Sequence, residues 1–189
     1  MKIVLASASP RRKELMRFVA DEFEIRPSDA DETLPEGIQP ERAAEYLSAL
    51  KAQAAECHEN EIVIGCDTVV VIDNTILGKP HTSQECFDML KILSGKTHKV
   101  FTGVTFRGFG NNFSFTEETA VEFYALSDEE ISEYIKTGEP FDKAGGYGIQ
   151  GKGAMLVKGI KGNYFNVVGL PASRLKRELE VFMRFCIDK

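Results

Sequence analysis

The sequence has no tryptophan, only four cysteines and no long apolar run. It contains no Cys-x-x-Cys pair and no histidine at zinc-ligand spacing from a cysteine. No stretch approaches the roughly 18 consecutive apolar residues that a membrane helix requires. These absences argue against a disulfide scaffold, a zinc module and a membrane protein. We expect a reduced, cytoplasmic protein.

Basic residues are in the minority. The chain has 23 Lys and Arg against 29 Asp and Glu, a net charge of −6. A broad basic surface for binding nucleic acid is therefore not expected, and any anionic ligand must be met by a local group of cations. With 43% hydrophobic and 28% charged residues, the 189-residue chain is typical of a soluble globular protein. Its length predicts a single domain over residues 1–189, or two tightly joined lobes.

Strand and helix patterns alternate along the chain. Residues 2–6 predict a buried strand that leads into a helix capped by Ser9, with Pro10 at its first position. Further helices are expected at 41–55, after Ser83, at 127–138 and near the C-terminus, and strands at 62–72, 100–106, 113–123, 154–160 and 164–168. Some strand pairs could form hairpins and others need helical crossovers, so we expect an α/β fold with a mixed sheet.

Three cations open the first predicted helix. Arg11, Arg12 and Lys13 follow the cap residue Ser9, where the helix dipole favours acidic side chains. This arrangement is repulsive unless an anion lies there. Backbone N–H groups, the hydroxyls of Ser7 and Ser9 and two guanidinium groups would together bind phosphate. A solvated basic turn is the alternative.

An acidic residue interrupts the most apolar predicted strand. Asp67 lies within residues 62–72, and burying an unpaired carboxylate would be costly. Either it pairs with a core cation or with backbone at a strand end, or it serves as a metal ligand or general base. The residues alone leave these alternatives open. Gly65, close by, leaves room for another group to approach.

Two lysines and a glycine-rich segment give weaker signals. Lys51 borders the buried stripe of the 41–55 helix, and Lys79 lies between Gly78 and Pro80, but surface lysines commonly occupy such places. Five of the 16 glycines fall in residues 145–153. That density suits backbone closing on a flat ligand, and Gln150 offers a donor and an acceptor to a base edge. A run of turns explains the glycines equally well.

The tetrapeptide Ser-Gly-Lys-Thr at 94–97 does not indicate a P-loop. The motif requires a glycine where this chain has Leu90, and the tetrapeptide is expected to follow a helix rather than to open one. A Walker-type nucleotide-binding site is therefore excluded.

Eight short motifs occur in order along nearly the whole chain. They are Leu5–Arg12, Glu32, Lys51-Ala52, Gly65–Val70, Gly78–Pro80, Leu93–Gly95, Asp142–Gly151 and Val168–Pro171. Together they resemble the Maf family of nucleoside triphosphate pyrophosphatases. The resemblance implies a mixed, twisted sheet flanked by helices, in two lobes around a cleft, similar to inosine triphosphate pyrophosphatases. It also implies a divalent cation, Mg²⁺ or Mn²⁺, and a homodimer.

The reaction implied by the resemblance is hydrolysis between the α and β phosphates of a nucleotide, which releases the monophosphate and pyrophosphate. Asp67 matches the family's proton acceptor, and Glu32 together with Asp67 would hold the metal ion. Whether Asp67 is base, ligand or both stays open. The residues expected to bind the phosphates are Ser7, Ser9, Arg12, Lys51 and Lys79.

Three positions resemble the branch of the family that acts on dTTP and UTP: Arg11, Thr68 and Gln150. A sequence resembling the branch that acts on 7-methyl-GTP would instead have Trp, Gln and Glu at these three positions. Cys66 and Gly146 depart from the more usual alanine. We therefore expect hydrolysis of dTTP and UTP, and of modified pyrimidine nucleotides that fit the same pocket, as a housekeeping role. The alternatives are a 7-methyl-GTP-type pyrophosphatase and a non-catalytic regulator of septum formation.

Overall fold

The computed structural model describes residues 1–187, which form a seven-stranded sheet with flanking helices. The strands are β1 (Lys2–Leu5), β2 (Glu24–Ile25), β3 (Glu61–Ile72), β4 (Thr75–Leu77), β5 (Thr97–Gly108), β6 (Asn111–Phe123) and β7 (Val157–Gly162). The α-helices are α1 (Pro10–Met16), α2 (Pro40–Ala54), α3 (Ser83–Leu93), α4 (Asp128–Lys136), α5 (Tyr164–Val168) and α6 (Ala172–Ile187). Among the described helices, none combines the length and apolar character needed to cross a membrane.

The sheet is mixed, as the sequence predicts. Its strand order is β2-β1-β3-β5-β6-β7, with β4 paired to β3. Strand β1 runs parallel to β2 and β3, whereas β4 is antiparallel to β3 and β7 is antiparallel to β6. Parallel neighbours need a crossover connection, which α1 provides between β1 and β2. The expected α/β class with a mixed sheet and flanking helices is confirmed.

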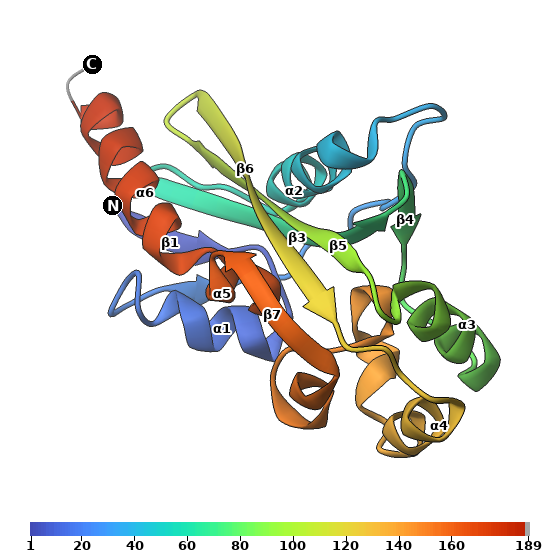
Figure 1. The fold of residues 1–189 in the computed structure, drawn as a ribbon. Helices are drawn as coiled ribbons and strands as arrows, with labels where there is room; N and C mark the ends of the chain where they lie inside the picture. Colours follow the sequence, from blue (N-terminus) through green and yellow to red (C-terminus); the bar gives the residue numbers. More distant parts are fainter. Residues whose placement is uncertain (188–189) are drawn as a thin grey trace. The chain divides into compact units, whose positions relative to one another are not determined.

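The chain divides into two compact units. The first unit comprises residues 1–67, 102–117 and 169–187, and the second comprises residues 68–101 and 118–168. Strands β3, β5 and β6 each contribute residues to both units, and their course can be followed in Figure 1. The sequence-based expectation of a single domain over residues 1–189 stays a prediction.

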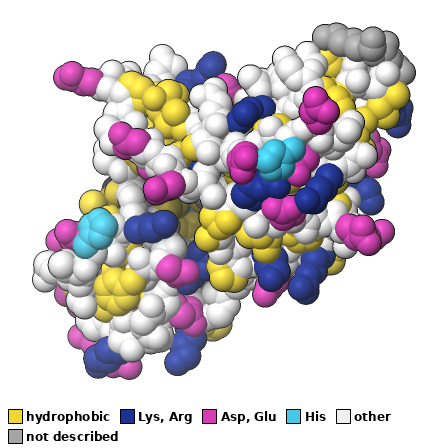
Figure 2. Space-filling model, turned by 180° about the vertical axis from the view of Figure 1, so that it is seen from behind, with side chains coloured by type: hydrophobic (Ala, Val, Ile, Leu, Met, Phe, Trp, Pro, Cys, Tyr) yellow, Lys and Arg dark blue, Asp and Glu magenta, His cyan; other side chains and the backbone are white. Residues whose placement is uncertain are grey.

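The first unit contains a chain of ion pairs across three neighbouring strands. Arg26, directly after β2, contacts Glu24 at 2.9 Å and Glu61 of β3 at 2.8 Å. Lys2 of β1 lies 3.7 Å from the same Glu61 carboxylate. The hydrogen bond from Arg26 lowers the pKa of Glu61 to about 2. Figure 2 shows acidic and basic side chains interspersed on the face that it presents.

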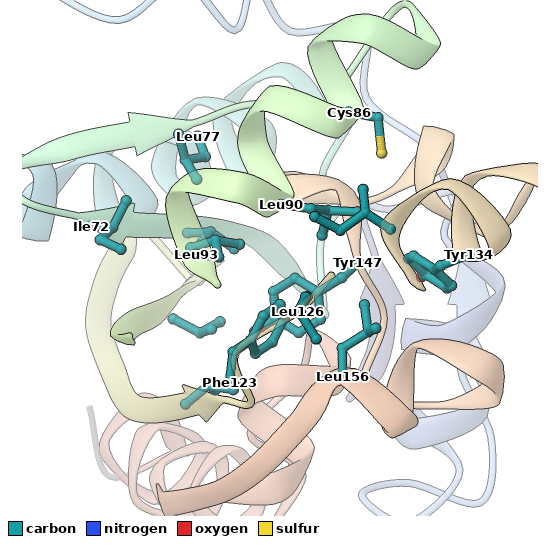
Figure 3. Close-up of a cluster of buried hydrophobic side chains, with 14 residues drawn as sticks. Ile72, Leu77, Cys86, Leu90, Leu93, Phe123, Leu126, Tyr134, Tyr147 and Leu156 are labelled. Carbon is teal, nitrogen blue, oxygen red and sulfur yellow. The ribbon is translucent and has the colours of Figure 1, made fainter. Parts of the chain in front are cut away.

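The second unit has a large apolar core of its own, drawn in Figure 3. Helices α3 and α4 pack against each other and cover this core. Helix α4 begins with the expected capping box, in which Ser127 and Glu130 each bond to the other's backbone N–H. Buried side chains from β3, β4, β5, β6, α3 and α4 belong to the same cluster as Tyr147, which lies in the glycine-rich segment. The core therefore holds this segment as well as the helices.

Residues 164–168 were expected to form a strand, and this prediction is wrong: they form helix α5. The side chain of Asn163 accepts hydrogen bonds from the backbone N–H groups of Phe165 and Asn166, which starts a helix. Asn166 is fully buried and donates to the Val100 carbonyl and to Thr119 Oγ1, at 3.0 Å each. Hydrogen bonds to strands that are distant in the sequence thus stabilise the helical conformation of this segment. The strand expected at 154–160 begins later, at Val157.

Candidate active site

The start of α1 brings three of the expected phosphate-binding residues together. Ser9 caps the helix, its Oγ accepting from the backbone N–H of Arg12 at 3.5 Å. The Oγ of Ser7 accepts from the backbone N–H of Ser9 and from Nη1 of Arg12, each at 3.3 Å. Because both acceptor positions of Ser7 are used, its hydroxyl hydrogen can point to an added acceptor, as phosphate binding requires.

Arg12 is held at a second point within the first unit. Its Nε donates to the carbonyl oxygen of Gly169 at 3.0 Å, so the side chain is fixed rather than solvated. Arg11 is half-buried in the same helical turn, and the first turn of α1 contains no acidic residue. The positive end of the helix dipole is therefore not neutralised by its own side chains. This geometry favours the phosphate-binding interpretation over a solvated basic turn.

Asp67, Lys51 and Glu32 meet in the first unit. Asp67 of β3 is 8% exposed, and its Oδ1 accepts a hydrogen bond from Nζ of Lys51 on α2. The same Nζ lies 3.1 Å from a carboxylate oxygen of Glu32, which is more than half exposed. The lysine thus bridges two carboxylates. Pairing of Asp67 with a cation was one of the alternatives left open by the sequence, and Lys51 is that cation. The pair is not enclosed in the core, because Lys51 also contacts the exposed carboxylate of Glu32.

Gly65 explains how α2 reaches Asp67. A Cβ at Gly65 would lie 2.1 Å from the backbone oxygen of Ser48, far closer than a side chain can approach. Helix α2 therefore lies directly on β3, and Lys51 is carried to the carboxylate. The room beside Asp67 that the sequence indicated is occupied by this helix.

Three more contacts fix α2 against the sheet in the first unit. A Cβ at Gly103 in β5 would lie 2.2 Å from the Ala44 carbonyl, so the helix backbone touches this strand too. The hydroxyls of Ser48 and Thr105 are 2.8 Å apart. Nη1 of Arg107 donates to three carbonyls at the C-terminal end of α2, at 2.8–3.1 Å, where the helix dipole favours a cation. These contacts thus fix the helix backbone from which the Lys51 side chain extends.

The two carboxylates suit a divalent cation that is shared with a substrate. Mg²⁺ prefers oxygen ligands and is commonly held by one or two carboxylates together with substrate phosphates. Within residues 1–187, no three His, Cys, Asp or Glu side chains gather as a closed metal site. Glu32 and Asp67 supply two carboxylates of the kind such a site uses, and the metal ion stays a prediction.

Cys66 packs beneath this site. Its side chain is fully buried and its Sγ lies 3.4 Å from the Gly169 carbonyl, the same group that accepts from Arg12. Burial raises the pKa of the thiol, so it stays protonated and unreactive near neutral pH. All four cysteines of the chain are free thiols, as the sequence predicts.

The other expected site residues, Thr68, Lys79 and Gln150, lie in the second unit. Thr68 follows Asp67 in β3 and is half-buried. Lys79 is exposed on the loop between β4 and α3. Gln150 is exposed at the residue before a 3₁₀ helix (Gly151–Leu156), and its side chain makes no capping hydrogen bond. Lys79 and Gln150 are thus placed where a ligand can be contacted. That these residues act together with Arg11 stays a prediction.

The loop that carries Lys79 is joined to the glycine-rich segment. The backbone N–H of Gly145 donates to the carbonyl of Gly78 at 2.9 Å. Gly145 and Gly146 have φ values of +71° and +69°, which side chains rarely tolerate. The sharp turn that these glycines allow brings the segment beside Pro80, 3.5 Å from a Cβ built at Gly146. Two of the predicted binding elements therefore share one backbone framework.

A buried histidine anchors the middle of the glycine-rich segment. His98 of β5 is 2% exposed, and its Nε2 is 2.7 Å from the hydroxyl of Tyr147. Both rings stand edge-on to Phe123, and the Tyr147–Phe123 pair can be seen in Figure 3. Burial lowers the pKa of His98 to about 4 and raises the pKa of Tyr147, so both groups are neutral near pH 7. A neutral hydrogen bond therefore fixes the segment to the core.

Comparison with known proteins decides the family. The model of the family described as Maf-like protein matches residues 2–182. The chain belongs to the Maf family. Among its Maf relatives, the dTTP/UTP pyrophosphatase of Bacillus cytotoxicus (strain NVH 391-98) is 50% identical over 182 residues, covering 96% of this chain and 95% of that protein. The dTTP/UTP pyrophosphatase of Geobacillus sp. (strain WCH70) is 49% identical over 180 residues, covering 95% and 97%.

A solved structure, the Ham1 protein of Staphylococcus aureus, is also similar to this Maf chain. It has 16% sequence identity and a TM-score of 0.49 and covers 66% of this chain and 73% of its own. At that level the likeness carries no argument about fold or function.

Two side chains that shape the glycine-rich segment of this Maf protein were not foreseen from the sequence. The hydroxyl of Tyr134 accepts from the backbone N–H of Gly148 at 3.2 Å. The carboxylate of Glu139 accepts from the backbone N–H groups of Lys152 and Gly153, at 3.1 and 3.3 Å. One signal for Glu139 was available. It follows the end of α4, where the helix dipole disfavours an acid, so it needs another partner.

Proposed function

We propose that this chain hydrolyses dTTP and UTP between the α and β phosphates, releasing the nucleoside monophosphate and pyrophosphate. Relatives at about half identity, aligned over nearly their whole length, are named dTTP/UTP pyrophosphatases. The observation that carries the proposal is the grouping of Lys51 with Glu32 and Asp67, because a cation and two carboxylates are what hydrolysis of a metal-bound triphosphate requires.

The first unit supplies the groups for the bond-breaking step. Arg12 and Lys51 neutralise phosphate oxygens, and a bound phosphate offers Lys51 a further partner besides Asp67 and Glu32. Asp67 accepts a proton from the attacking water while the oxygen of that water forms a bond to the α phosphorus. The bond from that phosphorus to the bridging oxygen breaks, and pyrophosphate leaves with the bonding electron pair. A divalent cation held by Glu32 and Asp67 would further neutralise the phosphates and acidify bound water.

Selection of the base follows from the hydrogen-bond inventory of uracil and thymine. Both present an N–H donor between two carbonyl acceptors. Gln150 can accept from the N–H and donate to a carbonyl, and Arg11 and Thr68 can supply further donors to the base or phosphates. Cytosine reverses part of this pattern. Unpaired polar groups would then cost about 1–3 kcal/mol each, so CTP should be rejected.

The test is a nucleotide panel with purified protein. UTP, dTTP, CTP, GTP and 7-methyl-GTP are each incubated with Mg²⁺ or Mn²⁺, and monophosphate and pyrophosphate are measured. We expect turnover of UTP and dTTP above the others and its loss on chelation. Release of diphosphate and orthophosphate would refute the proposed bond cleavage, and preference for 7-methyl-GTP would favour that branch of the family. A protein inactive on the whole panel would support the regulator of septum formation.

The remaining parts of the proposal concern the setting of the reaction. We propose action in the cytoplasm on canonical and modified pyrimidine nucleotides, and a homodimer, as the family resemblance implies. A mass of one or two chains by light scattering distinguishes monomer from dimer. Adding modified uridine triphosphates to the panel tests the wider substrate range.

A further inference from the structure

Glu139 controls the backbone that follows Gln150. Both of its carboxylate oxygens lie 3.1 Å from the N–H of Lys152, and one lies 3.3 Å from the N–H of Gly153. These N–H groups belong to the first turn of the 3₁₀ helix Gly151–Leu156, where donors have no partner inside the helix. The carboxylate therefore satisfies them from another part of the second unit.

Gly151, the residue directly after Gln150, is fitted to the same carboxylate. Its φ is +67°, and a Cβ there would lie 2.9 and 3.0 Å from the two oxygens of Glu139. Any side chain at this position would both strain the backbone and displace the carboxylate. The absence of a side chain at Gly151 thus allows the Glu139 carboxylate to lie against the backbone.

Glu139 is itself held in place. Its backbone N–H donates to Thr137 Oγ1 at 3.1 Å, and its carbonyl accepts from the Lys143 ammonium. Gly148 packs on the stem of Lys143, since a Cβ there would be 2.7 Å from Lys143 Cε. Lys143 therefore contacts both Glu139 and Gly148 of the glycine-rich segment. Between these supports, Gln150 keeps an exposed side chain on a fixed backbone.

We propose that Glu139 is a positioning residue that directs Gln150 and so sets the preference for uracil over cytosine. The inference rests on the proposed function. A long, exposed glutamine reads a base edge only if its backbone is fixed, because hydrogen-bond selectivity is lost when donor and acceptor shift by about 1 Å. Glu139 acts through the backbone of the residues after Gln150 and needs no contact with the substrate.

The test compares Glu139→Ala with Glu139→Gln, which keeps one acceptor oxygen. The readout is the ratio of kcat/KM for UTP to that for CTP. We expect Glu139→Ala to lower this ratio about tenfold and Glu139→Gln to keep it within about threefold of wild type. Glu133→Ala is the matched control, because Glu133 is an exposed acid on α4 that pairs with Lys136, three residues further along the same helix. An unchanged ratio in Glu139→Ala would overturn the proposal.

A double mutant separates positioning from general damage. In a Gln150→Ala background, the proposal requires that Glu139→Ala cause no further change in the ratio, since the residue through which it acts is gone. Multiplicative effects of the two substitutions would show that Glu139 acts by another route.

Amide hydrogen exchange gives a readout that does not depend on turnover. Glu139→Ala should speed exchange at Lys152 and Gly153, whereas Glu139→Gln and Glu133→Ala should leave both amides near the wild-type rate. Unchanged exchange in Glu139→Ala would refute positioning even if the enzyme is active. A wild type that hydrolyses neither UTP nor dTTP would refute the proposed function instead.

Discussion

The two units hold their candidate binding residues by different physical means. In the first unit the residues are charged and hold one another, with Lys51 between Glu32 and Asp67 and Arg12 fixed on Ser7. In the second unit Gln150 is neutral and exposed, and what is held is the backbone around it. Charge suits binding and cleavage of phosphates, which depend on electrostatic stabilisation. A fixed backbone suits discrimination between bases, which depends on geometry. We therefore expect substitutions within the Lys51, Glu32 and Asp67 group to change rate and substitutions around Gln150 to change selectivity.

The largest expected effect is on rate, from Asp67→Asn. The change is nearly isosteric but removes the proton acceptor, so we expect kcat to fall about a hundredfold or more with the fold retained. Steady-state kinetics and thermal melting check this. Asp73→Asn is the matched control, because Asp73 is an exposed acid in the turn after the same strand. A variant with lower stability but normal activity in its folded fraction would show that Asp67 serves only as an ion-pair partner.

Gly65→Ala tests how the first unit positions its charges. The new methyl group would overlap the backbone of α2, so we expect a loss of about 3 kcal/mol in the free energy of unfolding and displacement of Lys51 from Asp67. Urea unfolding measures the first effect, and reduced kcat in the folded protein reports the second. Gly159→Ala is the control, since nothing lies within 4 Å of a Cβ there. Equal stability of the two variants would contradict the close approach of α2.

The second unit should respond to mild acid through His98. Its pKa is about 4 when buried, against about 6.5 in an unfolded chain, so below pH 6.5 the unfolded state binds a proton that the folded state does not. Stability is then complete above pH 6.5 and falls by about 3 kcal/mol as the pH drops to 4. Urea unfolding between pH 7.5 and 4 checks this, with His98→Gln expected to flatten the slope. An identical slope in both proteins would exclude His98 as the cause.

Gln150→Glu tests whether the second unit controls base selectivity. A carboxylate has no donor for the uracil carbonyl and would face it repulsively, so we expect kcat/KM for UTP to fall about tenfold with a smaller change for CTP. Arg11→Ala and Thr68→Ala extend the measurement to the other two predicted specificity positions. If the UTP to CTP ratio stays the same in all three variants, the base is read elsewhere.

The acid response of the first unit is expected at lower pH than that of the second. The folded pKa of Glu61 is about 2, below the 4.5 of a free glutamate, because Arg26 donates to its charged form. Its contribution is present above pH 4.5 and is lost as the pH falls towards 2. Unfolding measured between pH 5 and 2.5 should show a shallower dependence in Glu61→Gln than in wild type. A loss confined to pH 6.5–4 in both proteins would leave His98 as the only source.

The sequence predicts the parts of this fold that are encoded locally. The Ser9 cap with Pro10, and the capping box at Ser127, lie within one helical turn, so their signals need no knowledge of the rest of the chain. Helix α5 was missed because the buried partners of Asn166 come from β5 and β6, distant in the sequence.

The site divides in the same way. The turn at the start of α1, where we predict phosphate binding, is recognisable from adjacent residues. The ion pair of Asp67 was foreseen only as one alternative, since choosing Lys51 required knowing that Gly65 admits α2. Glu139 gave only a weak local signal, because its partners are backbone N–H groups, which look alike in every sequence.

The division of the chain into segments has a consequence for its synthesis, which proceeds from the amino end. All residues of the second unit are present once Val168 has been made, whereas the first unit still lacks its last segment. The first unit must wait, because α6 supplies Phe182, whose ring lies 5.6 Å from that of Phe106 in its core. Asp67 is translated early and becomes part of a finished unit late. A chain interrupted before α6 would thus contain every residue of the second unit but lack part of the core of the first, and we expect such an incomplete product not to hydrolyse nucleotides.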